Sequence, residues 1–319
     1  MSNSNQVLLV GAGPMAVDYA KVLTALGRDI VVVGRSDASA AAFEEKTGIP
    51  AIPGGLDAYL ERGGTCPELA IVAVGVEALA QTTCRLLASG VRRVLLEKPG
   101  ALTRAEILAV DAASRETGAQ VLIAYNRRFY ASTLRALELI EEQGGVQSMH
   151  FEFTEWGHVI APLVKAPGVK PAWLLGNSTH VIDLAFYLAG QPQVWHGYTS
   201  GSLDWHPASA VFAGAGRTER GALFSYQANW AAPGRWGVEV LTGESRLIFR
   251  PMETLQLMRK GSVAIEPVAI DDRLDKQFKP GLYVQVSRFL EGATEGFCSV
   301  QEQAAVWDVY CGIAGYQQA

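Results

Sequence analysis

The sequence is poor in cysteine and histidine, and it carries no excess of positive charge. Its four cysteines lie far apart, at Cys66, Cys84, Cys298 and Cys311, with neither a CxxC pair nor a Cys/His spacing typical of a metal site. We therefore expect buried, reduced thiols, a cytoplasmic location and no bound metal. The net charge of −5 repels phosphate backbones, and no apolar run approaches the roughly 20 residues of a membrane span. These absences argue against nucleic-acid and membrane partners and favour small molecules.

The composition is that of an ordered protein with more than one hydrophobic core. The 319 residues are 49% hydrophobic and 18% charged, and a chain of this length usually forms two domains. Between residues 6 and 124, apolar runs alternate with segments of helical period, the pattern of βαβ units around a parallel sheet. The predicted strands are Gln6–Val10, Ile30–Val33, Ala51–Ile52, Leu69–Val74, Val94–Glu97 and Val121–Ala124, and the predicted helices are Met15–Leu26, Asp37–Thr47, Val76–Ser89 and Thr103–Thr117. We therefore predict an α/β fold whose first domain, residues 1–126, is a doubly wound Rossmann domain.

After Asn126 the pattern changes to helices and closely spaced strands with period-2 alternation. The predicted strands are Ser148–Trp156, Gln193–Thr199, Ala208–Phe212, Gly221–Trp230, Gly237–Leu241, Arg246–Arg250 and Leu255–Arg259, and the predicted helices are Ser132–Glu142, Ser178–Leu188, Leu282–Glu291 and Val300–Tyr316. This pattern predicts an α+β domain over residues 127–319, built on an open, mainly antiparallel sheet. We expect it to bind substrate and to form oligomer contacts through Trp and Phe on the open face, with the last helix able to pack back on the first domain.

A glycine-rich turn follows the first strand directly and opens a helix. Gly11 permits the tight turn, Gly13 lets the backbone approach a pyrophosphate, and Ala16 lets helix and strand pack closely. Pro14 suits the first helical turn, and Met15 lies with it at the helix N-terminus, where an anion is held. The alternative is a glycine-rich turn without a ligand, which the strand before it and the helix after it make less favoured.

The end of the second strand carries Arg35 and Ser36 where an NAD-preferring site usually has an acid. A guanidinium and a hydroxyl can bind a 2′-phosphate, and the missing carboxylate removes a repulsion. We therefore favour NADP(H) over NAD(H), the alternative being a surface arginine that tolerates either cofactor. Val74 and the charged pair Glu97 and Lys98 end two further strands at the carboxyl edge of the sheet, where such folds bind ligands, and we predict that they line the cofactor site.

Three further motifs complete a pattern known from one family. They are Glu97-Lys98-Pro99, the segment from Tyr125 to Phe129, and His180-Val181-Ile182-Asp183. With the glycine-rich turn, they make the chain similar to the glucose–fructose oxidoreductase/inositol dehydrogenase/rhizopine-catabolism (Gfo/Idh/MocA) family over nearly its whole length. The resemblance implies an NAD(P)-dependent dehydrogenase or reductase with sugar, cyclitol or related polyol substrates. It also implies a homodimer or homotetramer.

The resemblance further implies that Lys98 hydrogen-bonds the reacting oxygen and that His180 exchanges its proton. The chemistry is reasonable, since a lysine near a nicotinamide and a histidine can share proton transfer. The non-catalytic alternatives are that Lys98 is only a solvated charge at a strand end and that His180 is a core histidine. Many relatives have aspartate four residues before the histidine, whereas this chain has Gly176, followed by Asn177, which hydrogen-bonds but cannot carry a proton away. Asp183 either orients the imidazole or is a buried structural carboxylate.

Other polar and aromatic residues are candidates for substrate contact. We predict that Tyr125, Asn126, Arg127, Asn177 and His180 reach the substrate with Lys98, although arginine at a domain boundary often ties domains together. Four tryptophans could supply faces for a sugar ring, but core or interface packing is the favoured interpretation for them: Trp156, Trp173, Trp230 and Trp236.

The predicted function is hydride transfer between a nicotinamide and a secondary alcohol or ketone of a sugar-like substrate. Two alternatives stay open. One is a catalytically silent regulator that binds NADP or sugar, suggested by the missing aspartate. The other is net non-redox chemistry through a transient keto intermediate, which the same residues could support.

Overall fold

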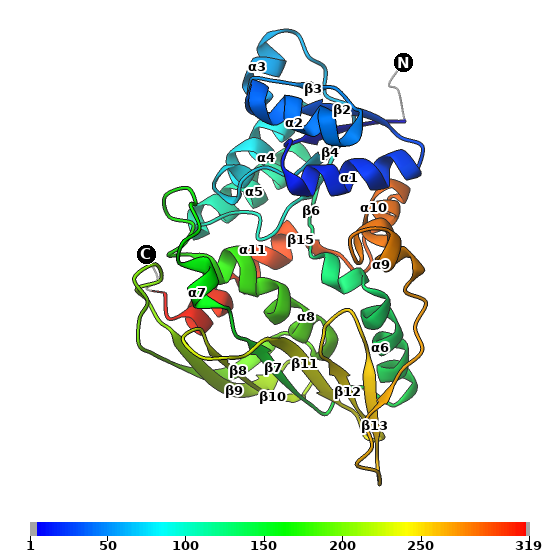
Figure 1. The fold of residues 1–319 in the computed structure, drawn as a ribbon, viewed down its shortest axis with the longest axis vertical. Helices are drawn as coiled ribbons and strands as arrows, with labels where there is room; N and C mark the ends of the chain where they lie inside the picture. Colours follow the sequence, from blue (N-terminus) through cyan, green and yellow to red (C-terminus); the bar gives the residue numbers. More distant parts are fainter. Residues whose placement is uncertain (1–4, 317–319) are drawn as a thin grey trace. The chain divides into compact units, whose positions relative to one another are not determined.

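The computed structural model describes residues 5–316, so the outermost ends of the two predicted domains, 1–4 and 317–319, lie outside it (Figure 1). The chain divides into two compact units. Unit 1 comprises Met1–Asn126 and Leu274–Ala305, and unit 2 comprises Arg127–Arg273 and Val306–Ala319. The prediction had placed 274–305 in the second domain. It lies in unit 1 because its short strand pairs with the Rossmann sheet and its longer helix packs on the first helix.

Unit 1 is a mainly parallel Rossmann sheet covered by helices. Its strands lie in the order β15-β6-β5-β4-β1-β2-β3, and only β15 pairs antiparallel with its neighbour among the described strands. The strands are β1 (Gln6–Val10), β2 (Asp29–Val33), β3 (Ala51–Ile52), β4 (Leu69–Val72), β5 (Arg93–Leu96), β6 (Gln120–Ile123) and β15 (Cys298–Ser299). The helices are α1 (Pro14–Ala25), α2 (Asp37–Thr47), α3 (Gly55–Glu61), α4 (Leu79–Ala88), preceded by the 3-10 turn η1 (Val76–Ala78), α5 (Arg104–Thr117) and α10 (Leu282–Glu291). The predicted fold class is confirmed.

The strands of unit 1 form because they are apolar on both faces. Val7, Leu8 and Leu9 are fully buried, as continuous apolar strands between two helical layers should be. Capping boxes at Ser36 and Thr103 begin α2 and α5. In Figure 1 the orange α10 lies beside the blue α1, and these helices are in contact.

Unit 2 is a twisted sheet with helices over one face. Its order is β14-β13-β12-β11-β7-β10-β9-β8, antiparallel except for the parallel pair β7 and β10. The strands are β7 (Ser148–Phe153), β8 (Pro192–Ser200), β9 (Val211–Thr218), β10 (Leu223–Asn229), β11 (Trp236–Leu241), β12 (Ser245–Phe249), β13 (Gln256–Arg259) and β14 (Glu266–Pro267). The helices are α6 (Ala131–Glu142), α7 (Gly157–Ile160) and α8 (Thr179–Ala189), with the 3-10 turn η2 (Asn126–Phe129) and the π-helical turn η3 (Leu174–Ser178). Helix α9 (Arg273–Gln277) starts at the unit boundary, and α11 (Val300–Ala314) begins in unit 1 and ends in unit 2.

The two faces of the second sheet differ in exposure: helices cover one, and the other is open. Helix α8 packs on β7 and β11, and the ring of Phe186 on α8 meets Phe151 and Phe224 edge to face. The prediction that Trp and Phe occupy the open face is wrong, because the period of the strands turns these rings toward the helices. The open face instead exposes Tyr198 and Leu223, at 75% and 61%.

Strand β9 lies later in the sequence than predicted for Ala208–Phe212. It runs through Gly214 and Gly216, whose small size suits the sheet. A Cβ on Gly214 would come within 2.3 Å of the Tyr226 ring, and one on Gly216 within 2.5 Å of the Trp195 Cβ. The glycines therefore make room for aromatic rings rather than mark a turn.

Candidate functional site

The turn after β1 can only be made by glycine at its first position. Gly11 has φ +126°, and a Cβ there would lie 2.2 Å from the carbonyl oxygen of Ala73 and 3.2 Å from the backbone nitrogen of Val74. The turn therefore passes directly against the end of β4. This brings two predicted cofactor residues, Gly11 and Val74, together at the carboxyl edge of the sheet.

The N-terminus of α1 is open to an anion. Gly13 is its N-cap, no side chain caps the helix, and its first turn contains no acidic residue. A Cβ on Gly13 would meet no atom within 4 Å, so a ligand has room to approach the backbone. Pro14 lies at the first helical position, and Ala16 is fully buried against the sheet. The free amide groups and the helix dipole thus fit the pyrophosphate of a dinucleotide.

Arg35 and Ser36 lie exposed after β2, but Ser36 has a structural partner as well. Its Oγ accepts a hydrogen bond from the backbone N of Ser39 at 3.3 Å and so caps α2. Asp37 follows in the first turn of the same helix. The guanidinium of Arg35 is therefore the stronger of the two candidates for a 2′-phosphate contact.

Lys98 lies in a tight turn that follows β5. The turn is closed by a hydrogen bond from the Gly100 N to the Glu97 carbonyl at 3.0 Å, and the Lys98–Pro99 peptide is cis. The Glu97 carboxylate accepts a hydrogen bond from the Tyr19 hydroxyl at 2.7 Å. Burial raises the pKa of Glu97, while the positive charge of Lys98 lowers it. Glu97 is thus fixed to α1 beside the half-buried lysine.

A buried glutamine holds the same turn from the other side. Gln303 on α11 donates from Nε2 to the Pro99 carbonyl at 3.0 Å and to the Tyr125 hydroxyl at 3.1 Å. Tyr125 is 1% exposed, and Asn126, 5% exposed, donates to the Pro280 carbonyl at 2.9 Å. Both residues therefore have structural partners in unit 1, and their contact with substrate stays a prediction.

Arg127 begins unit 2 and makes no hydrogen bond through its buried Nε to the described residues. Its guanidinium lies 4.8 Å from the ring centroid of Trp236, and the His180 ring lies 6.3 Å from the same indole. Burial lowers the pKa of Arg127, and the charge of Glu155 opposes that shift. Two predicted substrate residues, Arg127 and His180, thus lie beside the same indole ring of Trp236.

A buried carboxylate, which the sequence analysis did not single out, meets Asn177. Glu155 is 7% exposed and follows β7. Asn177 donates from Nδ2 to both carboxylate oxygens, at 2.9 and 3.1 Å, and the Ser178 hydroxyl donates to Oε1 at 2.7 Å. The only signal in the sequence was a glutamate at the end of an alternating strand.

These side chains line a cavity of about 280 Å³ in unit 2. Glu155, Asn177 and Trp236 form part of its wall, as does Trp173, whose buried Nε1 has no hydrogen-bond acceptor in the described part of the chain. A second cavity of about 620 Å³ shares Trp236 with the first and adds Arg127. Cavities of this size, with indole faces and a few convergent polar groups, are typical of small-molecule sites. We call the two together the Trp236 cavity.

Asp183 forms a buried ion pair with Arg128. It accepts two hydrogen bonds from Arg128, from Nε at 2.9 Å and from Nη2 at 2.6 Å, and each side chain is 2% exposed. The guanidinium also lies 4.5 Å from the ring centroid of Tyr187. The buried ion pair with Arg128 fits the structural interpretation of Asp183.

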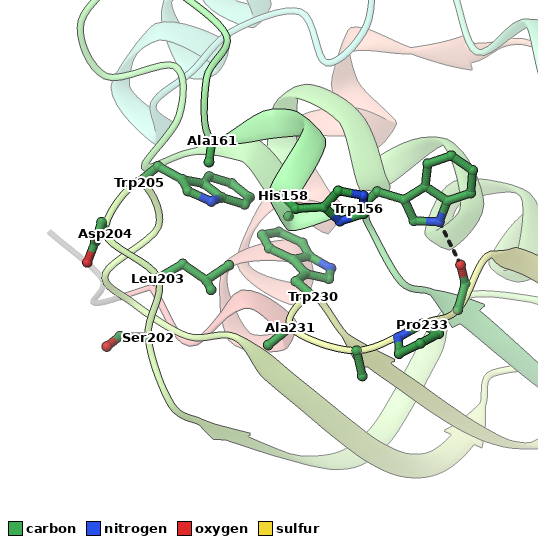
Figure 2. A pocket seen from close by; sticks show the side chains of 13 residues that line it. Trp156, His158, Ala161, Ser202, Leu203, Asp204, Trp205, Trp230, Ala231 and Pro233 are labelled. Carbon is green, nitrogen blue, oxygen red and sulfur yellow. Dashed lines mark hydrogen bonds between the residues drawn. The ribbon is translucent and has the colours of Figure 1, made fainter.

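A larger cavity of about 960 Å³ shares Trp156 with the Trp236 cavity. Figure 2 shows Trp205 and Trp230 beside each other, with His158 next to Trp156, whose Nε1 donates to the Gly234 carbonyl at 2.8 Å. The Trp205 and Trp230 rings are stacked at 5.6 Å between centroids. Trp230 is 2% exposed and Trp156 58%, so the four tryptophans divide between core packing and cavity walls.

Residues 5–316 lack two further features. No helix there combines the length and the apolar character needed to cross a membrane. No three side chains of His, Cys, Asp or Glu in that range gather as a metal ion would require.

The predicted site residues therefore form two groups. The glycine-rich turn, Val74, Glu97 and Lys98 meet at one edge of the sheet in unit 1. Arg127 and Asn177 line the Trp236 cavity in unit 2, and His180 lies against the ring of Trp236. Reasoning from the sequence missed Glu155, and it also missed Tyr19 and Gln303, which hold the lysine turn.

Comparison with known proteins agrees with the Rossmann fold of unit 1. Residues 5–125 match the model of the Gfo/Idh/MocA family, described as an oxidoreductase family with an NAD-binding Rossmann fold. No curated protein gives a significant match.

Several solved structures share the fold over nearly the whole chain. A protein from Desulfitobacterium hafniense, thought to be an NADPH-dependent oxidoreductase, is 19% identical with a TM-score of 0.80, covering 98% of this chain and 95% of that one. Levoglucosan dehydrogenase with NADH and L-sorbose is 18% identical, with a TM-score of 0.78 and coverage of 97% and 95%. UDP-N-acetylglucosamine 3-dehydrogenase from Acidithiobacillus ferrooxidans is 14% identical, with a TM-score of 0.75 and coverage of 98% and 97%. Identities this low establish a common fold and nothing finer. The match over residues 5–125 confirms the resemblance noted in the sequence: the Rossmann domain of this chain is similar to that of the Gfo/Idh/MocA oxidoreductase family.

Proposed function

We propose that this oxidoreductase transfers a hydride between NADP(H) and a secondary alcohol or ketone of a sugar, cyclitol or related polyol. The observation that carries the proposal is the uncapped N-terminus of α1 behind Gly11 and Gly13, which fits a dinucleotide pyrophosphate. The lysine turn lies at the same edge of the same sheet, because β4 and β5 are neighbouring parallel strands. A nicotinamide supplies the hydride chemistry when bound.

The side chains of this enzyme then supply charge and proton transfer. Lys98, with its ammonium group, hydrogen-bonds the reacting oxygen and stabilises the negative charge that develops there. His180 accepts or returns the hydroxyl proton. Arg127 and Asn177 orient the substrate against the face of Trp236.

The Trp236 cavity supports a polyol as substrate. Its indole walls suit the C–H faces of a sugar ring, and its amide, guanidinium and carboxylate groups suit hydroxyls that both donate and accept. Two proteins of the same fold act on such compounds, levoglucosan and a nucleotide sugar.

The activity can be tested by absorbance at 340 nm, with NADPH or NADP and a panel of sugars, cyclitols and keto-sugars. We expect oxidation of NADPH by a keto-sugar or reduction of NADP by a polyol. Cofactor binding without turnover on any member of the panel would favour the regulator instead. Conversion of a sugar with no net change at 340 nm would favour non-redox chemistry.

Arg35→Ala is expected to weaken NADPH binding by roughly 10–100-fold while NADH binding changes little, because a charge-assisted hydrogen bond to the 2′-phosphate is lost. Dissociation constants from cofactor fluorescence measure this. Lys46→Ala, an exposed change near the other end of α2, controls for the loss of one positive charge. Equal affinity of the unaltered protein for both cofactors, or equal weakening of both by Arg35→Ala, would contradict the assignment.

We also propose that the open face of the second sheet forms a homodimer or homotetramer contact. Val194, Tyr198 and Leu223 expose apolar surface there, although Trp and Phe do not.

The proposed cytoplasmic location is supported by the cysteines, all four in the described part of the chain and none in a disulfide.

A further inference from the structure

We propose that Glu155 is a specificity-determining positioning residue, which fixes the amide of Asn177 so that its carbonyl oxygen accepts a substrate hydroxyl in the Trp236 cavity. The inference rests on the proposed function for the class of ligand. The orientation of the amide rests on the hydrogen bonds in unit 2 alone.

The carboxylate determines which end of the amide faces it. An ionised carboxylate accepts hydrogen bonds and cannot donate them, so only Nδ2 of Asn177 can face Glu155. Two contacts of 2.9 and 3.1 Å hold it there. Oδ1 must then point away from Glu155, and none of the residues between 5 and 316 donates a hydrogen bond to it. Since Asn177 lines the cavity, this oxygen is an acceptor offered to a ligand.

Ser178 fixes the carboxylate itself. Its fully buried hydroxyl donates to Oε1 at 2.7 Å, from the residue where η3 ends and α8 begins. The carboxylate therefore accepts hydrogen bonds from two consecutive residues, Asn177 and Ser178, just before the helix that carries His180. The Trp236 cavity also has two donors in its lining residues, because Nε1 of Trp173 and Nε of Arg127 are buried and have no acceptor in this part of the chain.

The charges near the cavity do not all have one sign. Glu155 is close enough to Arg127 that its negative charge opposes the lowering of the guanidinium pKa by burial. The exposed Arg235 also lines the cavity. A ligand that presents hydrogen-bond donors on one edge and acceptors on the other fits this distribution. Neighbouring hydroxyls of a neutral polyol do both.

Glu155→Gln reverses the amide at nearly constant volume. The Gln side chain keeps one acceptor, which Ser178 uses, and places an NH2 group against Asn177. Two NH2 groups then oppose each other where Oε2 had accepted a hydrogen bond at 3.1 Å, so we expect the Asn177 amide to turn and to present its NH2 group, in place of Oδ1, to the cavity. Adding Asn177→Asp restores complementarity, because the glutamine NH2 donates to one carboxylate oxygen and the other oxygen faces the ligand. Asn177→Asp alone sets two carboxylates together, which raises the pKa of one of them.

Binding of L-sorbose, levoglucosan and myo-inositol is measured by tryptophan emission, with and without NADPH. All seven tryptophans lie in unit 2, so the signal reports on this cavity and its surroundings. For any probe that binds, Glu155→Gln is expected to weaken binding by roughly 10–100-fold, and the double variant to return within about threefold of wild type. Glu138→Gln, the control, makes the same chemical change at an exposed glutamate of α6 in the same unit, and should change affinity less than threefold.

Urea unfolding of wild type, Glu155→Gln, Asn177→Asp and the double variant gives a readout that needs no ligand. The double variant should be more stable than Asn177→Asp alone. A double variant no more stable than Asn177→Asp, unchanged binding in Glu155→Gln, or equal weakening by Glu138→Gln would overturn the inference. If wild type binds none of the three probes while the double variant is still more stable than Asn177→Asp, the polyol assignment fails and the orientation of the amide stands.

Discussion

Lys98→Met is expected to lower turnover by about 10²–10⁴-fold, with NADPH affinity within about threefold of wild type. Loss of a positioned proton donor commonly costs about 10²–10⁴-fold, and loss of a charge that stabilises an oxyanion about 10²–10³-fold. The cofactor should still bind, because the Gly11–Ala16 turn holds its pyrophosphate and lies on another strand end. Methionine keeps most of the side-chain length, so the turn held by Tyr19 and Gln303 should persist.

Single-turnover rates and NADPH dissociation constants, measured on the same preparations, separate these two effects. His180→Ala is the comparison, and it should cost less, because water or Asn177 can partly replace the imidazole in moving a proton. A Lys98→Met protein that transfers hydride at a near-wild-type rate would refute the role of the lysine. Equal loss of NADPH binding and turnover would instead point to a damaged cofactor site.

Asp183→Asn is expected to lower the free energy of unfolding by about 3–5 kcal/mol, because it leaves the buried guanidinium of Arg128 without a counter-charge. The pair is fully enclosed, with each side chain 2% exposed, so water cannot replace the carboxylate. Urea unfolding followed by tryptophan emission measures the loss in unit 2 specifically, since that unit contains every tryptophan.

An exposed pair of the same length is the control for this experiment. Arg135 and Glu138 also meet at 2.6 Å, but their side chains are 34% and 61% exposed. Glu138→Gln should therefore leave stability almost unchanged. A comparable loss in both variants, or no loss in Asp183→Asn, would show that burial does not control the strength of the Arg128 pair.

Most of the first domain could be predicted because its pattern is local. Apolar runs set the six parallel strands, and the glycine-rich turn marked the start of α1. Strand β15 could not be predicted in the same way. Its two residues, Cys298 and Ser299, have no period of their own and pair with Ile123 and Leu122 across a long stretch of sequence. The position of β9 was missed for a similar reason, because the aromatic side chains that require its glycines lie on other strands.

The site could be predicted only where a motif named it. Gly11, Gly13 and Lys98 follow strands in recognisable patterns, and the structure places them at one sheet edge. Glu155 has no motif, and its importance appears only when β7 and α8 bring it to Asn177. Asp183 had two reasonable interpretations. Its hydrogen bond with Arg128, which lies in the separate turn η2, fits the structural one, and spacing along α8 could not reveal that contact.

The discontinuity of unit 1 has a consequence for protein engineering. Its sheet is completed by β15, its first helix is covered by α10, and its lysine turn is held by Gln303, all encoded more than 150 residues after Asn126. A chimera that exchanges only residues 1–126 to alter cofactor choice would graft an incomplete module. The transplantable unit is a two-part gene cassette, the first 126 codons together with those for 274–305, and a fusion designer has to carry both.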